Sequence, residues 1–463
     1  MKNIKTFCLF LCTVLCLQCI MFPANADQSN YDISVAQGCN GLDAAVPYLG
    51  TQQKISNAEA IMLYEVNTDT LMYAWNADTP MYPASLVKIM TALLAAQKGN
   101  MADLVTVKAS TLATVPTDAT SVELLADEVL TLDQLMYCLL VGSGNDAAAV
   151  IAEHIAGSQS AFVSLMNQYA AELGCTATNF TNVHGLHDDN QVTTARDMTR
   201  IMAAAAKNDV FCTYFETSDY TVEQTNKSEA RNLTSSDHMM HMKVYEIYYD
   251  ERVAGGRTGI TNDGKSCLGT LARKGNMELV CVVMGSSSKY VEGTYIVDRL
   301  GCYDETKMLL DLGFQNVETA QIFYPQQALL QYTVTNGSAD VILGPHTSAS
   351  SVLPAGTQMK DLSFRYSDPI VDLTAPIEKG THISNVEVWV GGSCVAYAQL
   401  YALNQVSVRQ VNTLETHYED GNGGIGTVVT VILVIIILGI AVLLLVRYMN
   451  RKRPRTARNR RHR

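Results

Sequence analysis

After residue 26 the sequence lacks the close cysteine pairs of a structural metal site, because the eight cysteines found there include no CxxC pair. Protein zinc sites usually take their ligands from such closely spaced pairs. Two histidine pairs have helical spacing, His184 with His187 and His238 with His241, but neither has an evident third ligand. We therefore expect these histidines to be surface or structural residues, and we expect no metal and no other cofactor.

The cysteines do not define a disulfide pattern either. Four lie before residue 20, and the others are scattered: Cys39, Cys138, Cys175, Cys212, Cys267, Cys281, Cys302 and Cys394. Export would permit disulfides, but eight scattered cysteines allow too many pairings for their spacing to select one. Buried free thiols are the alternative in a domain of this size.

The N-terminus has the pattern of an export signal. Lys2 and Lys5 precede the apolar stretch Phe7–Phe22, and Ala24-Asn25-Ala26 supplies a small-residue cleavage pattern. We predict a signal peptide over residues 1–26 and a mature chain that begins at Asp27. An uncleaved anchor is the alternative, disfavoured by the short apolar core and the cleavage pattern that follows it.

The C-terminus combines an apolar run with a basic tail. Residues 425–446 carry no charge. At about 1.5 Å of rise per residue they would reach roughly 33 Å as a helix, against about 30 Å of bilayer hydrocarbon. The tail 447–463 contains nine basic residues and no acidic one, which is typical of a cytoplasmic end. We predict a single-pass protein of the bacterial cell membrane, with its catalytic domain extracytoplasmic and its C-terminus cytoplasmic.

Basic residues are scarce between these two ends. Of the 33 lysines and arginines, 11 lie in the signal and the tail, which leaves 22 against 45 acidic residues in the exported part. An ectodomain this acidic is not suited to binding the phosphate backbone of a nucleic acid. A nucleic-acid partner is therefore excluded from the expected functions, and the tail's position next to a membrane span argues against that use of its charge.

The length exceeds what one hydrophobic core usually holds, so we expect two folded domains. Up to Gly313, the pattern predicts an early strand hairpin around Asn67-Thr68-Asp69, then a run of helices, then strands from Ala254 onward and a closing helix over 295–312. After Phe314, apolar residues recur with period two between turn residues, as in a small antiparallel β domain. The predicted division is a signal peptide 1–26, a lead segment 27–54, a catalytic domain 55–315, a β-rich domain 316–405, a linker 406–424, a transmembrane helix 425–446 and a basic tail 447–463.

The first motif with chemical content is Ser85-Leu86-Val87-Lys88, at the start of a predicted helix behind Pro83. Residues three apart on a helix share a face, so the hydroxyl and the amine can meet. A serine hydroxyl is a weak nucleophile until a base takes its proton. Lys88 can be that base only when it is neutral, which requires burial and a nearby cation. Taken alone, the motif also allows Ser85 to be a helix cap and Lys88 a solvated charge.

Two further motifs follow in order. Ser143-Gly144-Asn145 lies in a Gly-rich turn after a predicted helix, a position from which side chains can reach a cleft. Alone, it would be read as a plain turn. Arg257-Thr258-Gly259 ends an apolar strand behind two glycines, which would let a substrate backbone approach the strand edge. The Arg257 charge suits a carboxylate, and it would also lower the pKa of Lys88.

With these motifs, the sequence resembles the serine D-Ala-D-Ala carboxypeptidases, the low-molecular-mass penicillin-binding proteins of the penicilloyl-serine transferase superfamily (peptidase S11-like). The matching stretches are Pro83–Ala92, Ser143–Ala148, His184–Leu186 with Thr194–Met198, and Gly256–Gly259. The resemblance implies an α+β fold of the β-lactamase/transpeptidase type, in which a helical cluster packs on a five-stranded antiparallel sheet. A small all-β domain and one C-terminal transmembrane helix would follow.

The same resemblance implies catalytic roles. Ser85 would attack the D-Ala-D-Ala peptide carbonyl, Lys88 would be the general base, and Ser143 would relay a proton to the leaving D-alanine. The backbone N–H groups of Ser85 and Ile260 would form the oxyanion hole. Water would release the acyl group, and β-lactams would trap Ser85 because they imitate the substrate.

Substrate-binding roles are implied as well. Asn145 would hold the substrate's amide, Arg257 and Thr258 would receive its terminal carboxylate, and Arg196 would support the carboxylate side. The partners would be peptidoglycan stem peptides that end in D-Ala-D-Ala. The sequence departs from the family at Arg257, where the family usually has Lys. An arginine keeps the charge and can bind a carboxylate as a fork, but it cannot give up a proton.

Three alternatives stay open at this point. A D,D-endopeptidase that cuts cross-links would use the same site. A class A-like β-lactamase would need a deacylating Glu in the stretch Thr181–Val192, which has none. A catalytically silent wall-binding or signalling protein is opposed by the intact serines, lysine and asparagine, whereas Arg257 and the long basic tail leave it possible.

Overall fold

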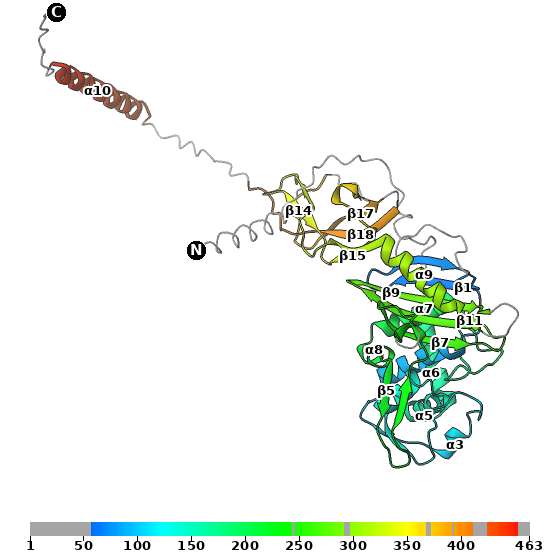
Figure 1. The fold of residues 1–463 in the computed structure, drawn as a ribbon. Coiled ribbons are helices and arrows are strands. Elements are labelled where there is room, and N and C mark those ends of the chain that lie inside the picture. Colours follow the sequence, from blue (N-terminus) through cyan, green and yellow to red (C-terminus); the bar gives the residue numbers. More distant parts are fainter. Residues whose placement is uncertain are drawn as a thin grey trace, which may run out of the picture. The chain divides into compact units, whose positions relative to one another are not determined.

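The structure is a computed structural model that describes residues 57–242, 246–290, 297–366, 372–390, 393–410 and 424–451 (Figure 1). The predicted signal peptide, the lead segment 27–54 and most of the basic tail lie outside these residues. The described chain divides into a compact unit that ends at Arg409 and a second unit that begins at Gln410.

A five-stranded antiparallel sheet forms the centre of the first unit, in the order β2-β1-β9-β8-β7. Its strands are β1 (Ala60–Glu65), β2 (Thr70–Trp75), β7 (Val253–Ile260), β8 (Ser266–Lys274) and β9 (Met277–Ser286). The β1–β2 connection contains the predicted turn residues Asn67-Thr68-Asp69, and β8–β9 is a second hairpin. Strand β7 lies at the edge, so one side of the Arg257-Thr258-Gly259 motif pairs with β8 and its other side has no strand partner in the sheet. The five-stranded sheet implied by the sequence is confirmed.

Alternate residues of the strands enter two separate hydrophobic cores. In β1, Met62 and Tyr64 face the core with the helical cluster, whereas Ile61 and Leu63 face the core with the closing helix. Because successive side chains of a strand point to opposite faces, a sheet covered on both faces reads as a continuous apolar run. This explains why the strands lack a polar face.

The helical cluster supplies one cover of the sheet (Figure 1). It contains α2 (Val87–Lys98), α3 (Ala109–Leu112), α4 (Leu132–Leu140), α5 (Asn145–Ala156), α6 (Gln159–Glu172), α7 (Ala195–Ala206) and α8 (Asp209–Phe215). Short strand pairs frame it: β3 (Leu104–Thr106) with β4 (Val129–Thr131), and β5 (Asp219–Val222) with β6 (Arg231–Thr234). Three 3₁₀ turns, η3 (Ala84–Leu86), η4 (His238–Met240) and η5 (Met359–Asp361), complete the described helices of the first unit together with α9.

The closing helix α9 (Gly301–Asn316) covers the opposite face of the sheet, after the short pair β10 (Lys289–Tyr290) and β11 (Val297–Arg299). The sequence predicts this helix to end before Gly313, but the helix continues through that residue. A Cβ atom at Gly313 would come within 2.7 Å of Leu279 and 3.4 Å of Leu63. The glycine is therefore a point of close helix–sheet packing and not a terminator.

The remaining strands of the first unit form an all-β domain, as predicted. A five-stranded sheet of order β13-β14-β18-β17-β16 packs beside the pair β12–β15. The bounds are β12 (Val317–Phe323), β13 (Leu330–Tyr332), β14 (Val341–Gly344), β15 (Ala349–Pro354), β16 (Ser363–Tyr366), β17 (His382–Val390) and β18 (Ser393–Ala402). Buried alternate residues such as Val386 and Val388 form its core. All seven described cysteines of the chain are free thiols.

The second unit contains helix α10 (Gly424–Arg451). In the part of the chain that the structure describes, no helix combines the length and the apolarity needed to cross a membrane. The predicted transmembrane helix over 425–446 therefore stays a prediction.

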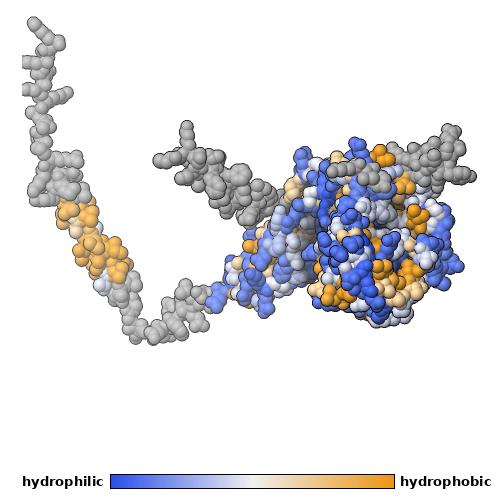
Figure 2. Space-filling view, turned by 60° about the horizontal axis from the view of Figure 1, so that its bottom comes forward, coloured by the Kyte–Doolittle hydropathy of each residue, from blue (hydrophilic) through white to orange (hydrophobic). Residues whose placement is uncertain are grey.

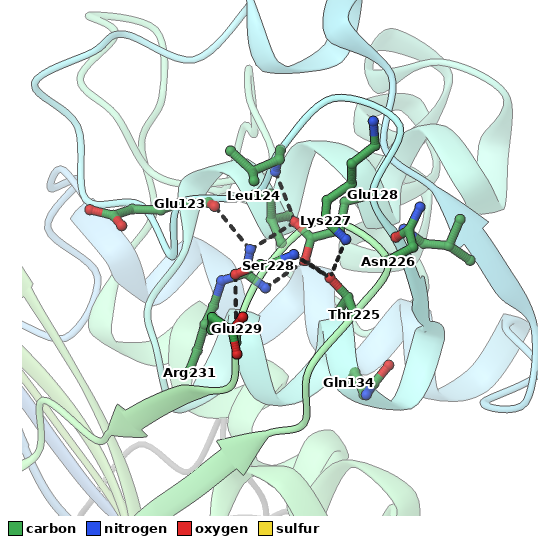
Figure 3. Close-up of polar contacts among 12 residues, drawn as sticks. Glu123, Leu124, Glu128, Gln134, Thr225, Asn226, Lys227, Ser228, Glu229 and Arg231 are labelled. Atoms are coloured by element: carbon green, nitrogen blue, oxygen red, sulfur yellow. Dashed lines mark hydrogen bonds and ion pairs between the residues drawn. The ribbon is translucent and has the colours of Figure 1, made fainter.

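A buried ion pair fastens the segment before α4 to the β5–β6 hairpin (Figure 3). Both terminal nitrogens of Arg231 donate to the carboxylate of Glu128 at 2.7 Å, and Thr225 donates to it at 2.8 Å. Burial alone would raise the pKa of Glu128, but the hydrogen bonds from Arg231, Leu125 and Thr225 outweigh it and place the pKa below its ordinary value. The Glu128 side chain is fully buried, so this pair is poorly screened by solvent.

Substitution Glu128→Gln should lower the free energy of unfolding by about 3–5 kcal/mol, because it leaves the Arg231 charge buried without its counter-ion. Urea denaturation near neutral pH measures the loss. Because the folded carboxyl has a lowered pKa, the pair stabilises above the ordinary carboxyl pKa, and the difference from wild type should shrink as the pH falls through the folded pKa. The exposed Glu123→Gln is the control and should stay within about 0.5 kcal/mol. Equal effects of the two variants would contradict the assignment.

Candidate active site

The hydroxyl of Ser85 is presented by a tight turn at the start of α2. Pro83 precedes Ala84, which has a φ of 47°, and the 3₁₀ turn η3 then leads into the helix. A positive φ at a residue with a Cβ costs free energy, so the surrounding packing must hold this turn in place. Ser85 is half-buried, and its chain neighbour Ala84 lines a cavity together with residues that include Tyr82 and Ile260.

Lys88 lies one helical turn further on and is completely buried. Its Nζ atom is 3.1 Å from Ser85 Oγ, 2.7 Å from Asn145 Oδ1 and 2.6 Å from the carbonyl oxygen of His184. Burial, and then the neighbouring charge of Arg257, lower the pKa of Lys88 well below its ordinary value. The structure thus brings the predicted nucleophile and the predicted base together, and it provides the environment that an uncharged amine requires.

His184 contributes its backbone to this site. Burial lowers the pKa of the His184 side chain to about 4, so its imidazole is neutral near pH 7. The Nδ1 atom of that ring accepts the backbone N–H of Leu186 at 3.2 Å. The histidine therefore shapes the turn whose carbonyl oxygen faces Lys88. Among the described residues, no group of three or more histidine, cysteine or acidic side chains is arranged to hold a metal.

Ser143 and Arg257 meet on the other side of the site. Ser143 has a φ of 59°, and its Oγ atom accepts a hydrogen bond from Nη2 of Arg257. Nη1 of Arg257 donates to the carbonyl oxygen of Leu140 at 2.9 Å. The guanidinium is 1% exposed, and burial lowers the pKa of Arg257 to about 10. It is still a cation near pH 7, one that faces the catalytic groups and not bulk water.

The turn that carries Ser143 and Asn145 is held by a carboxylate that the sequence reasoning did not single out. Asp146 accepts hydrogen bonds from Ser121 Oγ at 2.6 Å and from Leu124 N at 3.0 Å. Thr120 adds a contact, since its carbonyl oxygen accepts the backbone N–H of Asn145. An acidic residue in the first turn of α5 was the available signal, because such residues favour helix N-termini.

Strand β7 completes the site next to Ser85. A Cβ atom at Gly259 would lie 2.9 Å from the backbone nitrogen of Ser85, so only glycine lets the strand edge approach the nucleophile this closely. The following residue, Ile260, has a side chain that is 73% exposed beside the cavity. Thr258 has its hydroxyl 2.8 Å from that of Ser236, a second residue that the sequence did not mark.

Asp237 lies on the same segment as Ser236 and is fully buried. One carboxylate oxygen accepts the backbone N–H of Met239 at 3.0 Å, and the other has no hydrogen-bond partner within the described structure. Burial raises the pKa of Asp237 to about 6, opposed by the hydrogen bond from Met239 and by the charges of His241 and Arg257. The site thus contains a buried carboxylate in the electrostatic neighbourhood of its buried guanidinium.

Arg196 is engaged elsewhere. Its guanidinium pairs with both carboxylate oxygens of Asp78, at 2.6 and 3.0 Å, and its backbone N–H bonds to Ala77. This arrangement ties the start of α7 to the connection after β2. A contact between Arg196 and a substrate carboxylate stays a prediction, as does an oxyanion hole formed with Ile260.

The assembled groups suit acyl transfer. A half-exposed hydroxyl faces a buried amine of lowered pKa, which is the arrangement that activates a serine nucleophile. A buried cation and the Thr258 hydroxyl lie at the strand edge, where an anionic end of a peptide could be received.

Comparisons with known proteins agree with this geometry. Residues 49–288 match the family described as D-alanyl-D-alanine carboxypeptidase (peptidase S11), and residues 318–408 match the penicillin-binding protein 5 C-terminal domain. The D-alanyl-D-alanine carboxypeptidase DacC of Escherichia coli is 31% identical over 362 residues, which cover 76% of this chain and 84% of the relative. DacF of Bacillus subtilis is 29% identical over 76% of this chain and 86% of its own length.

A solved structure of a penicillin-binding protein has the same fold as this chain. Penicillin-binding protein 5 from Haemophilus influenzae superposes with a TM-score of 0.64 and 30% identity, over 77% of this chain and 100% of that protein. The family match over residues 49–288 contains the Ser85, Ser143 and Arg257 motifs. From its family match, its relatives and its fold, this chain belongs to the D-alanyl-D-alanine carboxypeptidases of peptidase family S11, the low-molecular-mass penicillin-binding proteins.

Proposed function

We propose that this protein removes the terminal D-alanine from peptidoglycan stem pentapeptides through an acyl-enzyme on Ser85. One observation carries the proposal: Lys88 Nζ is 3.1 Å from Ser85 Oγ, and the amine is fully buried with a lowered pKa. Membership of the family supports D-alanyl-D-alanine carboxypeptidase activity. The assignment of each step to a residue is our own.

The first step forms the acyl-enzyme. The hydroxyl proton of Ser85 passes to the neutral amine of Lys88 while the Oγ atom bonds to the carbonyl carbon of the penultimate D-alanine. Developing charge on the carbonyl oxygen would be stabilised by the backbone N–H groups of Ser85 and Ile260. Asn145 would hold the substrate's amide through its side-chain N–H group, since its oxygen already faces Lys88.

The second step releases terminal D-alanine. Its nitrogen needs a proton as the C–N bond breaks. Ser143 would donate its hydroxyl proton to that nitrogen and take up the proton that Lys88 received from Ser85, so that Lys88 is neutral again. The Ser143 oxygen accepts a hydrogen bond from Arg257, which leaves its own O–H free to donate. Arg257 and Thr258 would receive the terminal carboxylate. Water, deprotonated by the same base, would then attack the ester and restore Ser85. A β-lactam would acylate Ser85 in the same way.

Arg257, in place of the family's usual lysine, can still perform the electrostatic part of this chemistry. It keeps a positive charge near Lys88, which lowers the pKa of the base, and the same charge faces an incoming carboxylate. It cannot act as a proton donor or acceptor, because guanidinium keeps its proton. The proposed mechanism therefore routes no proton through it.

A D,D-endopeptidase activity on cross-linked peptides would use the same residues. No residue described above favours it over carboxypeptidase action. A β-lactamase is disfavoured because Thr181–Val192 has no Glu to activate a deacylating water. A silent wall-binding protein would have no use for a buried lysine with a lowered pKa beside a serine, because burying an amine costs free energy.

We also propose the domain division 55–315 for the catalytic domain, 316–405 for the β-rich domain and 406–424 for the linker. The placement at the cell membrane, with an extracytoplasmic catalytic domain, belongs to the same proposal. Support comes from the uncharged run 425–446, the basic tail and the apolar surface of the described part of α10 (Figure 2). None of the described helices qualifies as a membrane span, so the proposal rests mainly on the sequence.

Substitution Ser85→Ala should abolish covalent labelling by a fluorescent penicillin and D-alanine release from a pentapeptide. The variant removes only the attacking oxygen, so folding should be unaffected. Gel fluorescence and an enzymatic D-alanine assay measure the two outcomes. The exposed Ser164→Ala is the matched control and should label like wild type. Labelling of Ser85→Ala would overturn the assignment of the nucleophile.

Acylation should be lost as the pH falls through the folded pKa of Lys88, because only the neutral amine accepts the serine proton. With that pKa lowered, the rate should already be high near pH 7, where an ordinary lysine is almost fully protonated. Lys88→Arg should reduce kcat/KM by about 10²–10⁴-fold, since arginine does not deprotonate. Lys98→Arg, at the exposed end of the same helix, is the control. An acylation rate that rises only above pH 10 would refute a neutral Lys88.

Deletion of residues 425–463 should release a soluble protein that still binds penicillin, because the described site lies wholly before residue 305. Fractionation into membrane and soluble pools, followed by penicillin labelling, measures this. Deletion of the tail 447–463 alone should leave the protein in the membrane pool. Persistent membrane association of the longer deletion would count against the proposed anchor.

A further inference from the structure

Ser236 extends the pocket that is proposed to receive the substrate's carboxylate. Its segment, residues 235–239, follows β6 and runs beside the edge strand β7. The Ser236 hydroxyl lies 2.8 Å from the hydroxyl of Thr258, and its side chain is half-buried and not sealed in the core. Thr258 therefore has a hydrogen-bond partner before any substrate arrives.

Hydrogen bonds to Tyr303 of helix α9 hold the backbone around Ser236 in place. Its carbonyl oxygen accepts the phenolic O–H of Tyr303 at 3.0 Å, and the Tyr303 oxygen accepts the backbone N–H of His238 at 3.2 Å. Tyr303 belongs to α9, is 2% exposed and stacks on the His238 ring with centroids 5.0 Å apart. Asp237 donates its backbone N–H to Ser235 Oγ, which holds the neighbouring residue. The hydroxyl is thus placed by a rigid element and not by a free loop.

The two hydroxyls share one hydrogen bond, and either could be its donor. A carboxylate only accepts hydrogen bonds. If Thr258 donated to Ser236, it would present lone pairs to the carboxylate, and the two would repel. If Ser236 donates to Thr258, the Thr258 proton is free to point at the carboxylate while its oxygen stays satisfied.

Arg257 makes this donor more important. Both of its terminal nitrogens already donate to protein acceptors, Ser143 Oγ and the carbonyl oxygen of Leu140. Those contacts use one N–H of each terminal nitrogen and hold the guanidinium toward the helical cluster, while its Nε–H is buried without a hydrogen-bond partner among the described residues. The guanidinium therefore attracts a carboxylate mainly through its charge. The hydroxyl pair then supplies the directional hydrogen bond.

We propose that Ser236 is a positioning residue for carboxylate recognition: it donates to Thr258 and so directs the Thr258 proton toward the terminal carboxylate of the substrate. The inference rests on the proposed function of this site and on the proposed role of Thr258. It assigns to Ser236 a part in selecting substrates with a free C-terminal carboxylate.

The test compares two substrates on the full-length protein in detergent. One is a peptide that ends in D-Ala-D-Ala, and the other is the same peptide with its terminal carboxylate converted to a carboxamide. Ser236→Ala should lower kcat/KM for the carboxylate peptide about 10-fold, mainly through KM, and should change the carboxamide peptide less than about 2-fold. The preference for a free carboxylate should therefore fall by roughly the same factor of ten.

Matched variants separate positioning from general damage. Thr234→Ala removes a nearby exposed hydroxyl, which bonds to Asp219 and not to Thr258, and should keep the wild-type preference. Ser236→Thr retains a donor and should restore it. In a Thr258→Val background, Ser236→Ala should have no further effect on the preference, since its acceptor is gone. If Ser236→Ala fails to fold, Ser236→Cys replaces it as a weaker donor of similar size.

The outcomes distinguish this inference from the proposed function. Absence of D-alanine release by the wild-type protein would refute the proposed function and, with it, this inference. Release by wild type, together with an unchanged preference in Ser236→Ala or equal losses on both substrates, would overturn the role of Ser236 alone. Additive effects of Ser236→Ala and Thr258→Val would also overturn it, because the two hydroxyls would then act independently.

Discussion

An amine that is taken out of water beside a guanidinium does not readily carry a proton, and the chemistry proposed for this protein depends on that constraint. Lys88 is fully buried, and the charge of Arg257 adds to the effect of burial on its pKa. The cost of burying an amine is offset by three polar contacts, to Ser85, Asn145 and the carbonyl oxygen of His184. The site is therefore an electrostatic arrangement that only a packed interior can maintain.

Much of the surrounding fold serves to keep that interior closed while leaving one hydroxyl accessible. The sheet carries a separate core on each face, so its edge strand β7 is held rigidly next to Ser85. Gly259 permits the close approach, and the strained turn at Ala84 presents the nucleophile at the surface. Asp146 and the Glu128–Arg231 pair hold the segment that covers Ser143 and Asn145.

The replacement of the family's usual lysine by Arg257 changes which groups of the site contact one another and which can orient a substrate. A guanidinium has more donors than an ammonium, and here both of its terminal nitrogens are directed to Ser143 and Leu140. A buried carboxylate, Asp237, lies in its electrostatic neighbourhood and partly balances the buried charge. In the proposed mechanism, orientation of an anionic substrate depends more on neighbouring hydroxyls, which would give the segment 235–239 a function beyond packing.

The sequence by itself determined the order of the motifs, the all-β domain and the shared helix face of Ser85 and Lys88, because helical spacing and period-two patterns are local properties. The five-stranded antiparallel sheet followed from the family resemblance. It misplaced the end of α9, since nothing local distinguishes a glycine that ends a helix from one that packs against Leu279. Only the tertiary structure decided that Lys88 is buried, that Arg196 pairs with Asp78, and that the Ser236 hydroxyl hydrogen-bonds to Thr258. These facts depend on contacts between residues far apart in the chain, and burial and charge proximity have no signature in a short stretch of sequence.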